Sequence, residues 1–182
     1  GLSVRCKDKV VIVTGAGSGI GEATAMRFGE EGARVICMDV RAAEDVSEKI
    51  NRLGGKAVGH IADVSKWADW ERVVEHTISN WNRVDVLVAV AGVISRTVDT
   101  VVDQTEEEWD RVININLKGI WFGMKAVLPH MIRNGGGKIV NVSSLAAIVG
   151  LPGLAAYTSS KGGVSALSRQ AAIEYAKDNI HI

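Results

Sequence analysis

Two residues near the end of the chain have the types and the spacing of an acid/base pair. Tyr157 and Lys161 stand four residues apart in "AAYTSSKGG". Four residues make about one helical turn, so both side chains would share a face of a helix. A free phenol has a pKa near roughly 10, and a neighbouring ammonium lowers it by favouring the phenolate. The pair is therefore a candidate tuned acid/base, although the same spacing also fits an ordinary helix start.

A second segment with chemical meaning is rich in glycine and lies near the start of the chain. The stretch "TGAGSGIGE", residues 14–22, follows an apolar, β-branched run and precedes a helical pattern. Glycine permits the positive φ of a tight turn and the close approach of a pyrophosphate. The helix that begins near Gly19 would point free amides at that anion. This context predicts a dinucleotide site, and the absence of G-x-x-x-x-G-K-[ST] from the sequence disfavours a phosphoryl-transfer loop.

An acidic residue, Asp39, ends the second apolar run, eighteen residues after Gly21. A carboxylate there can accept hydrogen bonds from the adenosine ribose hydroxyls, and it would repel a 2′-phosphate. Ser18 and Val40 bring no positive charge to this position, although Arg41 is close. We therefore expect NAD rather than NADP. The structural alternative is that Asp39 is a solvated strand end.

The elements that must position these residues alternate along the chain. Apolar runs typical of strands cover residues 9–15, 34–39, 56–63, 83–92 and 136–144. Amphipathic stretches typical of helices cover residues 19–33, 41–55, 65–81, 105–134 and 155–178. Strict alternation predicts right-handed crossovers and a parallel sheet covered on both faces. The expected fold class is α/β, a doubly wound, Rossmann-type sheet in three layers, α/β/α, with residues 1–182 as a single dinucleotide-binding and catalytic domain.

Composition restricts the partners of the chain. Among 182 residues, Lys plus Arg and Asp plus Glu are both 21, and zero net charge disfavours nucleic acid or an anionic membrane as a partner. Two cysteines, Cys6 and Cys37, make no disulfide framework, and no apolar run reaches about 18 residues. These features predict a cytoplasmic protein without a metal. The histidines are expected to be surface or capping residues; they are His60, His76, His130 and His181.

Taken together, these motifs resemble the short-chain dehydrogenase/reductase family in its compact, NAD-preferring form. The matching segments follow the family's order and spacing: "TGAGSGIG" (14–21), "DV" (63–64), "NINLKG" (114–119), "IVNVSS" (139–144) and "YTSSK" (157–161). The resemblance implies hydride transfer between NAD(H) and a secondary alcohol or ketone. Two alternatives stay open: an NADPH-dependent 3-oxoacyl-thioester reductase, and a dinucleotide-binding protein without turnover.

The resemblance also implies roles for individual residues. Tyr157 would be the acid/base, and Lys161 would assist it and bind the nicotinamide ribose. Ser144 would hold the substrate oxygen, with Ser143 as a neighbouring alternative. Asn116 would hold a water that links Lys161 to solvent, with Asn114 as a less suitable neighbour. The implied cofactor-binding residues are Gly15, Ser18, Gly19, Ile20, Gly21, Asp39, Asp63, Val64, Ala91, Gly92, Tyr157 and Lys161.

The sequence departs from the family in two places. Relatives end the fourth strand in Asn-Asn-Ala-Gly, whereas residues 89–92 are Ala-Val-Ala-Gly, so the usual side-chain hydrogen bonds cannot form and local rigidity is in doubt. The sequence stops at "DNIHI", where relatives enter a sixth strand. We expect it to be part of a longer chain that continues into the last strands and a substrate lid. By resemblance, the stretches 105–134 and 155–178 would pack between subunits of a homodimer or homotetramer.

Overall fold

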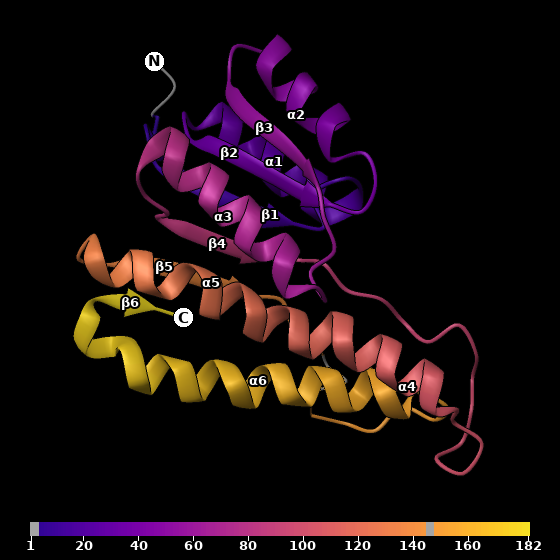
Figure 1. Cartoon of the computed structure of the whole chain (residues 1–182). Helices are drawn as coiled ribbons and strands as arrows, with labels where there is room; N and C mark the ends of the chain where they lie inside the picture. The colour runs from indigo at the N-terminus through magenta and orange to yellow at the C-terminus, as the bar shows by residue number, and fades with distance from the viewer. Residues whose placement is uncertain (1–3, 145–147) are drawn as a thin grey trace.

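The computed structural model describes residues 4–144 and 148–182 (Figure 1). In this part of the chain the strands form one six-stranded parallel sheet with the order β3-β2-β1-β4-β5-β6. The strands are β1 (Val10–Thr14), β2 (Arg34–Asp39), β3 (Lys56–Ile61), β4 (Val86–Ala89), β5 (Gly137–Asn141) and β6 (Ile180–His181). From β1 the strand order runs to one edge of the sheet through β2 and β3 and then to the other edge from β4. The place between β1 and β4 is the switch point at which doubly wound sheets bind ligands.

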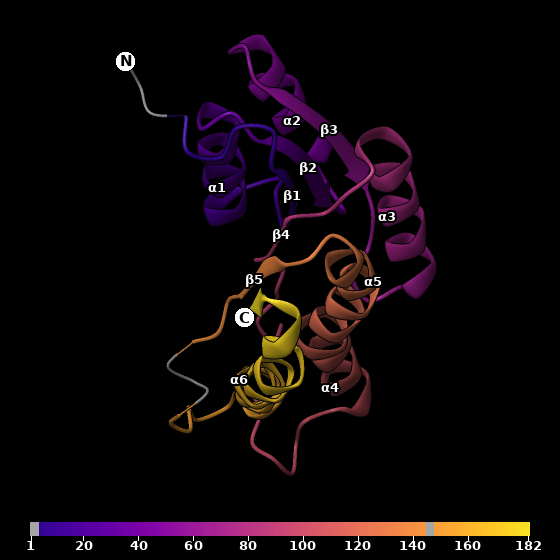
Figure 2. The same ribbon diagram turned by 90° about the vertical axis from the view of Figure 1, so that its left-hand side faces the viewer.

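Helices cover the sheet on both faces, as the alternating sequence predicted. They are α1 (Gly19–Glu30), α2 (Ala43–Arg52), α3 (Trp67–Trp81), α4 (Glu106–Ile113), α5 (Gly119–Arg133) and α6 (Ala155–Tyr175). Figure 2 shows α1 on one side of the sheet and α3 and α5 on the other. The predicted α/β fold class, with its doubly wound sheet, is confirmed.

Alternating side chains of the strands build two separate cores. Ile12 of β1 belongs to the core under α3, α5 and α6, whereas its neighbour Val13 belongs to the core under α1 and α2. This alternation follows from the period of two along a strand. Because both faces of β1 are buried, its sequence is continuously apolar, which is the pattern that identified it. The predicted core role of the tryptophan stripe holds for Trp70, which is 1% exposed.

The predicted bounds of several elements were wrong, most clearly for the long helix and the fourth strand. The single helix expected over 105–134 is interrupted by a π-helix, Asn114–Lys118, between α4 and α5. A π-turn keeps the chain helical, so the apolar spacing of the sequence did not reveal it. The strand expected over 83–92 is only Val86–Ala89, because the chain leaves the sheet after Ala89. There the Thr14 hydroxyl accepts the amides of Val90 and Ala91, each at 3.1 Å.

Candidate active site

The glycine loop between β1 and α1 is packed too tightly for side chains. A Cβ on Gly21 would lie 1.9 Å from the Gly15 carbonyl oxygen, and one on Gly15 would lie 2.8 Å from the amide of Ala91. Gly15 and Gly19 also have positive φ values, +66° and +53°, which glycine adopts without strain. The loop therefore brings bare backbone to the switch point, with the N-terminus of α1 behind it.

Asp39 is fixed beside this loop at the end of β2. Its Oδ2 accepts the amide of Gly17 at 2.8 Å, and its Oδ1 accepts the amide of Arg41 at 3.3 Å. A Cβ on Gly17 would lie 2.0 Å from the Arg41 carbonyl oxygen and 2.9 Å from Asp39 Oδ2. Each carboxylate oxygen keeps lone pairs for a further donor, so Asp39 can accept hydrogen bonds from a ligand without moving.

Most of the twelve residues predicted to bind the cofactor line one cleft of about 450 Å³ at the carboxyl ends of the strands, whereas Tyr157 and Lys161 are not among its lining residues. Ten of them take part: Gly15, Ser18, Gly19, Ile20, Gly21, Asp39, Asp63, Val64, Ala91 and Gly92. The cleft combines a loop of bare amides, a helix N-terminus and an acceptor at the end of β2. These are the groups that a dinucleotide requires for its pyrophosphate and its ribose. The residues present therefore fit a dinucleotide cofactor.

Asp63 and Val64 enter this cleft from the segment after β3. The Asp63 carboxylate accepts the amide and the hydroxyl of Ser65 at 2.9 and 2.6 Å, which closes a turn at this point. The amide of Asp63 itself is bound by the Asp69 carboxylate at 2.8 Å. Val64 is buried against Gly119, where a Cβ would lie 2.8 Å from its side chain. Both residues are thus held rigidly at the wall of the cleft.

Tyr157 and Lys161 lie together in the first turns of α6, as their spacing predicted. The Lys161 ammonium nitrogen, Nζ, is 5.8 Å from the centre of the Tyr157 ring. Lys161 is only 7% exposed, and burial lowers the pKa of its ammonium. Its Nζ donates to the Val142 carbonyl at 3.5 Å. A Cβ on Gly92 would lie 3.4 Å from Nζ, so Lys161 approaches the cleft at Gly92.

Asn116 lies within the π-helix and connects three parts of the site. Its Oδ1 accepts the amide of Val93 and its Nδ2 donates to the carbonyl of Val93, each at 2.8 Å. The same Nδ2 donates to the Ser160 hydroxyl at 3.1 Å, and that hydroxyl donates to the Tyr157 carbonyl at 2.7 Å. Both Nδ2 hydrogens are therefore used in joining the segment after β4 to α6, whereas Oδ1 keeps a second lone pair for a further donor. Asn114, the alternative, is exposed.

The two serines after β5 differ in their placement. Ser143 donates to the backbone carbonyl of Lys161 at 3.2 Å, and its hydroxyl lies 3.0 Å from that of Ser165. Ser143 therefore ties the end of β5 to α6 and is committed to a structural contact. Ser144 is partly buried and directly precedes residues 145–147, which lie outside the described part of the chain.

The histidines are placed less uniformly than predicted. His76 and His181 are exposed, but His60 is half-buried in β3, with its ring 4.8 Å from that of His76. The expectation of a surface or capping role was wrong for His60, because α3 covers this part of the strand. Within residues 4–144 and 148–182, no three His, Cys, Asp or Glu side chains could hold a metal together. None of the described helices has the length and apolar content needed to cross a membrane.

The fold and the cleft define a dinucleotide-binding α/β protein. The model of the short chain dehydrogenase family matches residues 9–182, and the chain belongs to that family. It is 34% identical to the cyclohexanol dehydrogenase of Acinetobacter sp. (strain SE19), and the match covers 100% of this chain and 72% of the relative. It is 39% identical to the 3-oxoacyl-(acyl-carrier-protein) reductase FabG of Thermotoga maritima, over 98% of this chain and 73% of the relative.

Solved structures show the same fold. A 7 alpha-hydroxysteroid dehydrogenase complexed with NADH and 7-oxo glycochenodeoxycholic acid superposes with a TM-score of 0.91 at 32% identity. The superposition covers 98% of this chain and 69% of that one. A short chain dehydrogenase from Mycobacterium smegmatis gives a TM-score of 0.91 at 35% identity, over 98% and 75% of the two chains. The relatives' chains are thus longer than this sequence, which spans about 70% of them.

Proposed function

We propose that this chain catalyses NAD-dependent oxidation of a secondary alcohol to a ketone, or the reverse reduction. In this proposal the cleft binds NAD, which would accept the hydride when bound. Tyr157 takes the alcohol proton as phenolate and returns it in the reverse direction, and Ser144 holds the substrate oxygen. Lys161 favours the phenolate by its charge and binds the nicotinamide ribose. Asn116 completes the set by holding a water that links Lys161 to solvent.

One observation carries this proposal: Lys161, one helical turn from Tyr157 on α6, lies beside the predicted cofactor cleft at Gly92. Lys161 Nζ lies against Gly92, and Gly92 lines the cleft together with the glycine loop and Asp39. A buried ammonium beside a phenol has little water to screen it, so it acts on the phenol more strongly than at a surface. An acid/base next to a dinucleotide cleft is the arrangement that alcohol oxidation requires, since proton and hydride leave the same carbinol group.

The test replaces the proposed acid/base in the full-length protein. Tyr157→Phe removes the hydroxyl and keeps the ring, so we expect turnover to fall by roughly 10²-fold or more while NAD binding is retained. The readout is formation of NADH with a panel of secondary alcohols, together with NAD affinity by calorimetry. Tyr175→Phe, in the last turn of the same helix, is the matched control. Turnover by Tyr157→Phe near that of the unmodified protein would refute the assignment.

The proposed preference for NAD rests on Asp39. Its carboxylate is held at the cleft by two backbone amides and presents negative charge where a 2′-phosphate would lie. We expect the unmodified protein to bind NAD more tightly than NADP, and Asp39→Ala to lose much of that difference. Dissociation constants of both cofactors decide the matter. Tighter binding of NADP by the unmodified protein would favour the second candidate, a 3-oxoacyl-thioester reductase, which the likeness to FabG supports.

Further parts of the proposal concern the molecule in its setting. Residues 1–182 form a single dinucleotide-binding and catalytic domain that acts on a small-molecule alcohol or ketone in the cytoplasm. The two cysteines, Cys6 and Cys37, are both free thiols, which suits a reducing compartment. Two or four copies associate through α5 and α6.

A further inference from the structure

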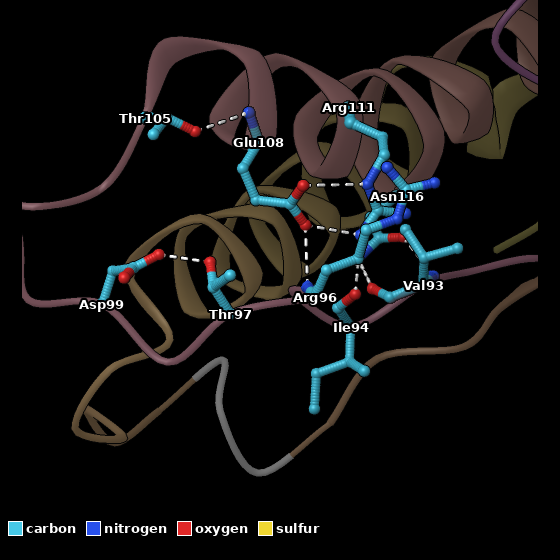
Figure 3. Close-up of polar contacts among 9 residues, drawn as sticks. All are labelled: Val93, Ile94, Arg96, Thr97, Asp99, Thr105, Glu108, Arg111 and Asn116. Carbon is cyan, nitrogen blue, oxygen red and sulfur yellow. Dashed lines mark hydrogen bonds and ion pairs between the residues drawn. The ribbon is translucent and has the colours of Figure 1, made fainter.

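An ion pair on α4 holds the backbone of the segment that follows β4 (Figure 3). The Oε1 atom of Glu108 accepts the amide of Arg96 at 2.8 Å. The Nη2 atom of Arg111 donates to the carbonyl of Ile94 at 2.9 Å. Glu108 and Arg111 stand one helical turn apart, so one turn of α4 binds two backbone groups of the segment, the Arg96 amide and the Ile94 carbonyl. The Ile94 side chain points away from α4 (Figure 3).

The pair is itself rigidly constructed. Arg111 meets the two carboxylate oxygens of Glu108 as a fork, with Nη2 to Oε1 at 2.6 Å and Nε to Oε2 at 3.2 Å. Glu108 is 8% exposed, and its own amide donates to the Thr105 hydroxyl at 3.2 Å, which caps α4. Hydrogen bonds from Arg111 and from the Arg96 amide lower the pKa of Glu108 to about 2. A bidentate, charge-assisted contact of this kind fixes orientation as well as distance.

The segment held by the ion pair, residues 93–96, directly follows Gly92 at the proposed active site. Its first peptide is held by Asn116, which binds both the amide and the carbonyl of Val93. Gly92, one residue earlier, lies against both Lys161 Nζ and Asn116 Oδ1. Asn116 thus fixes one end of residues 93–96, and the ion pair fixes the other. If the ion pair were lost, residues 94–96 would lose their hydrogen bonds to α4, and Gly92 would be held only by the contacts of Thr14 to the two amides before it and of Asn116 to Val93 among the described hydrogen bonds.

We infer that Glu108 and Arg111 are positioning residues for the proposed reaction: they fix residues 93–96 and thereby the Gly92 wall beside Lys161. The inference rests on the proposed function, because it assigns the benefit of that rigidity to proton transfer. Because the proposed proton transfer depends on the position of Lys161 beside Tyr157, a displaced wall is expected to reduce kcat more than it weakens binding of the substrate. A misplacement of about 1 Å is enough to cost on the order of 10²-fold in rate.

The experiment compares variants of Glu108 in the full-length protein. Glu108→Ala removes the contact to the Arg96 amide and the ion pair that orients Arg111, whereas Glu108→Gln keeps an oxygen for the Arg96 amide. Glu107→Ala, on the exposed face of the same turn, is the matched control. For Glu108→Ala we expect kcat to fall about 10- to 100-fold with KM and NAD affinity within about threefold, and Glu108→Gln to recover part of the loss. Amide hydrogen exchange of residues 93–96 should rise in Glu108→Ala but not in Glu107→Ala.

Specific outcomes overturn the inference. Unchanged exchange of residues 93–96 in Glu108→Ala would show that the ion pair does not hold the segment. Equal losses in kcat, KM and NAD affinity would show a general structural role. If Glu108→Ala does not fold, the variants Glu108→Gln and Arg111→Lys test the inference in its place. An unchanged kcat in both of them would contradict the positioning role. Tyr157→Phe in the same assay separates the two levels: if it keeps turnover, the proposed function fails, whereas the exchange result still tests the ion pair.

Discussion

At the scale of single residues, burial gives Lys161 its chemical character. Loss of solvent lowers the pKa of its ammonium, because burial disfavours the charged form and leaves few groups to stabilise it. One of these groups is the Val142 carbonyl, 3.5 Å away. On another side the space beside Nζ is kept open because residue 92 has no side chain. Small changes in this space should therefore alter the chemistry before they alter the fold.

The substitution Gly92→Ala tests this expectation. The new methyl carbon would lie 3.4 Å from both Lys161 Nζ and Asn116 Oδ1, in tight van der Waals contact, so it would fill the space beside the ammonium without disturbing the fold. We expect kcat to fall by roughly tenfold and the melting temperature to change little. Gly150→Ala is the control, since nothing lies within 4 Å of the Cβ it adds. Steady-state kinetics and thermal unfolding check the prediction, and an unchanged kcat would contradict it.

Local spacing foretold some residues of the site and could not foretell others. Tyr157 and Lys161 are one helical turn apart, so the sequence alone places them on one face. Thr14 and Glu108 were missed because their partners are backbone amides, 76 and 12 residues away, and a backbone amide leaves no trace in residue type. The doubt over rigidity at residues 89–92 arose for the same reason. The missing asparagines suggested a loose segment, but Thr14 binds two of its amides.

At the scale of elements, β3 and α3 meet through a pair of histidine rings. His60 of β3 lies edge to face against His76 of α3, with ring centres 4.8 Å apart. The Nε2 atom of His60 is buried and has no hydrogen-bond partner among the described residues. Burial lowers the pKa of His60 to about 4, and the charges of His76 and Arg72 contribute to the same shift. The contact between this strand and this helix therefore requires a neutral imidazole.

This requirement makes the packing of β3 against α3 dependent on pH. An unfolded histidine has a pKa near about 6.5, so between about 6.5 and 4 the unfolded chain binds a proton that the folded chain does not. The stabilisation is complete above about pH 6.5 and is lost as the pH falls toward 4. When the pH falls through this range, the free energy of unfolding of the unmodified protein should decrease by on the order of 1–3 kcal/mol more than that of His60→Leu.

The measurement is urea unfolding at several pH values between 4.5 and 7.5. The difference between the two proteins isolates His60 from carboxylates such as Glu108, which also lose stabilisation in acid. Parallel curves of unfolding free energy against pH would show that His60 is not held neutral by the fold. Asn51→Leu is unsuitable as a control, since Asn51 binds β3 through both its amide atoms. Ile61→Leu, at the exposed end of β3, serves instead.

Element type was predictable wherever one periodicity prevailed. The run at residues 34–39 became β2 without change, because its apolar residues are buried on both faces. The break in the long helix was not predictable: residues 114–118 keep a helical pattern, and only the tertiary contacts of Asn116 distinguish the π-turn. Such a turn shifts side-chain directions while the chain stays helical, and it often occurs at functional sites. Here it aims Asn116 at Val93.

At the scale of the whole molecule, α5 and α6 run side by side and leave a groove between them. The groove has a volume of about 420 Å³ and is lined by apolar side chains such as Leu128 and Leu167, with Trp121 at its edge. Trp121 is a large aromatic side chain that is 45% exposed. Lys125 lies 5.2 Å from its ring centre, which orients the indole at the surface. Exposed aromatic residues in an apolar setting are typical of protein interfaces.

The prediction of a homodimer or homotetramer is tested at this surface. If two copies meet through α5 and α6, a carboxylate at position 121 would lose its water in the interface and replace the apolar contact of the indole, which disfavours association even with Lys125 nearby. We therefore expect Trp121→Asp to shift the full-length protein to a monomer and to leave its circular dichroism unchanged. Leu53→Asp is the control, because Leu53 follows α2 and is 72% exposed on the other side of the sheet. Light scattering over a range of micromolar concentrations gives the masses. A monomeric unmodified protein would contradict the oligomer, and a variant that keeps the oligomeric mass would place the interface elsewhere.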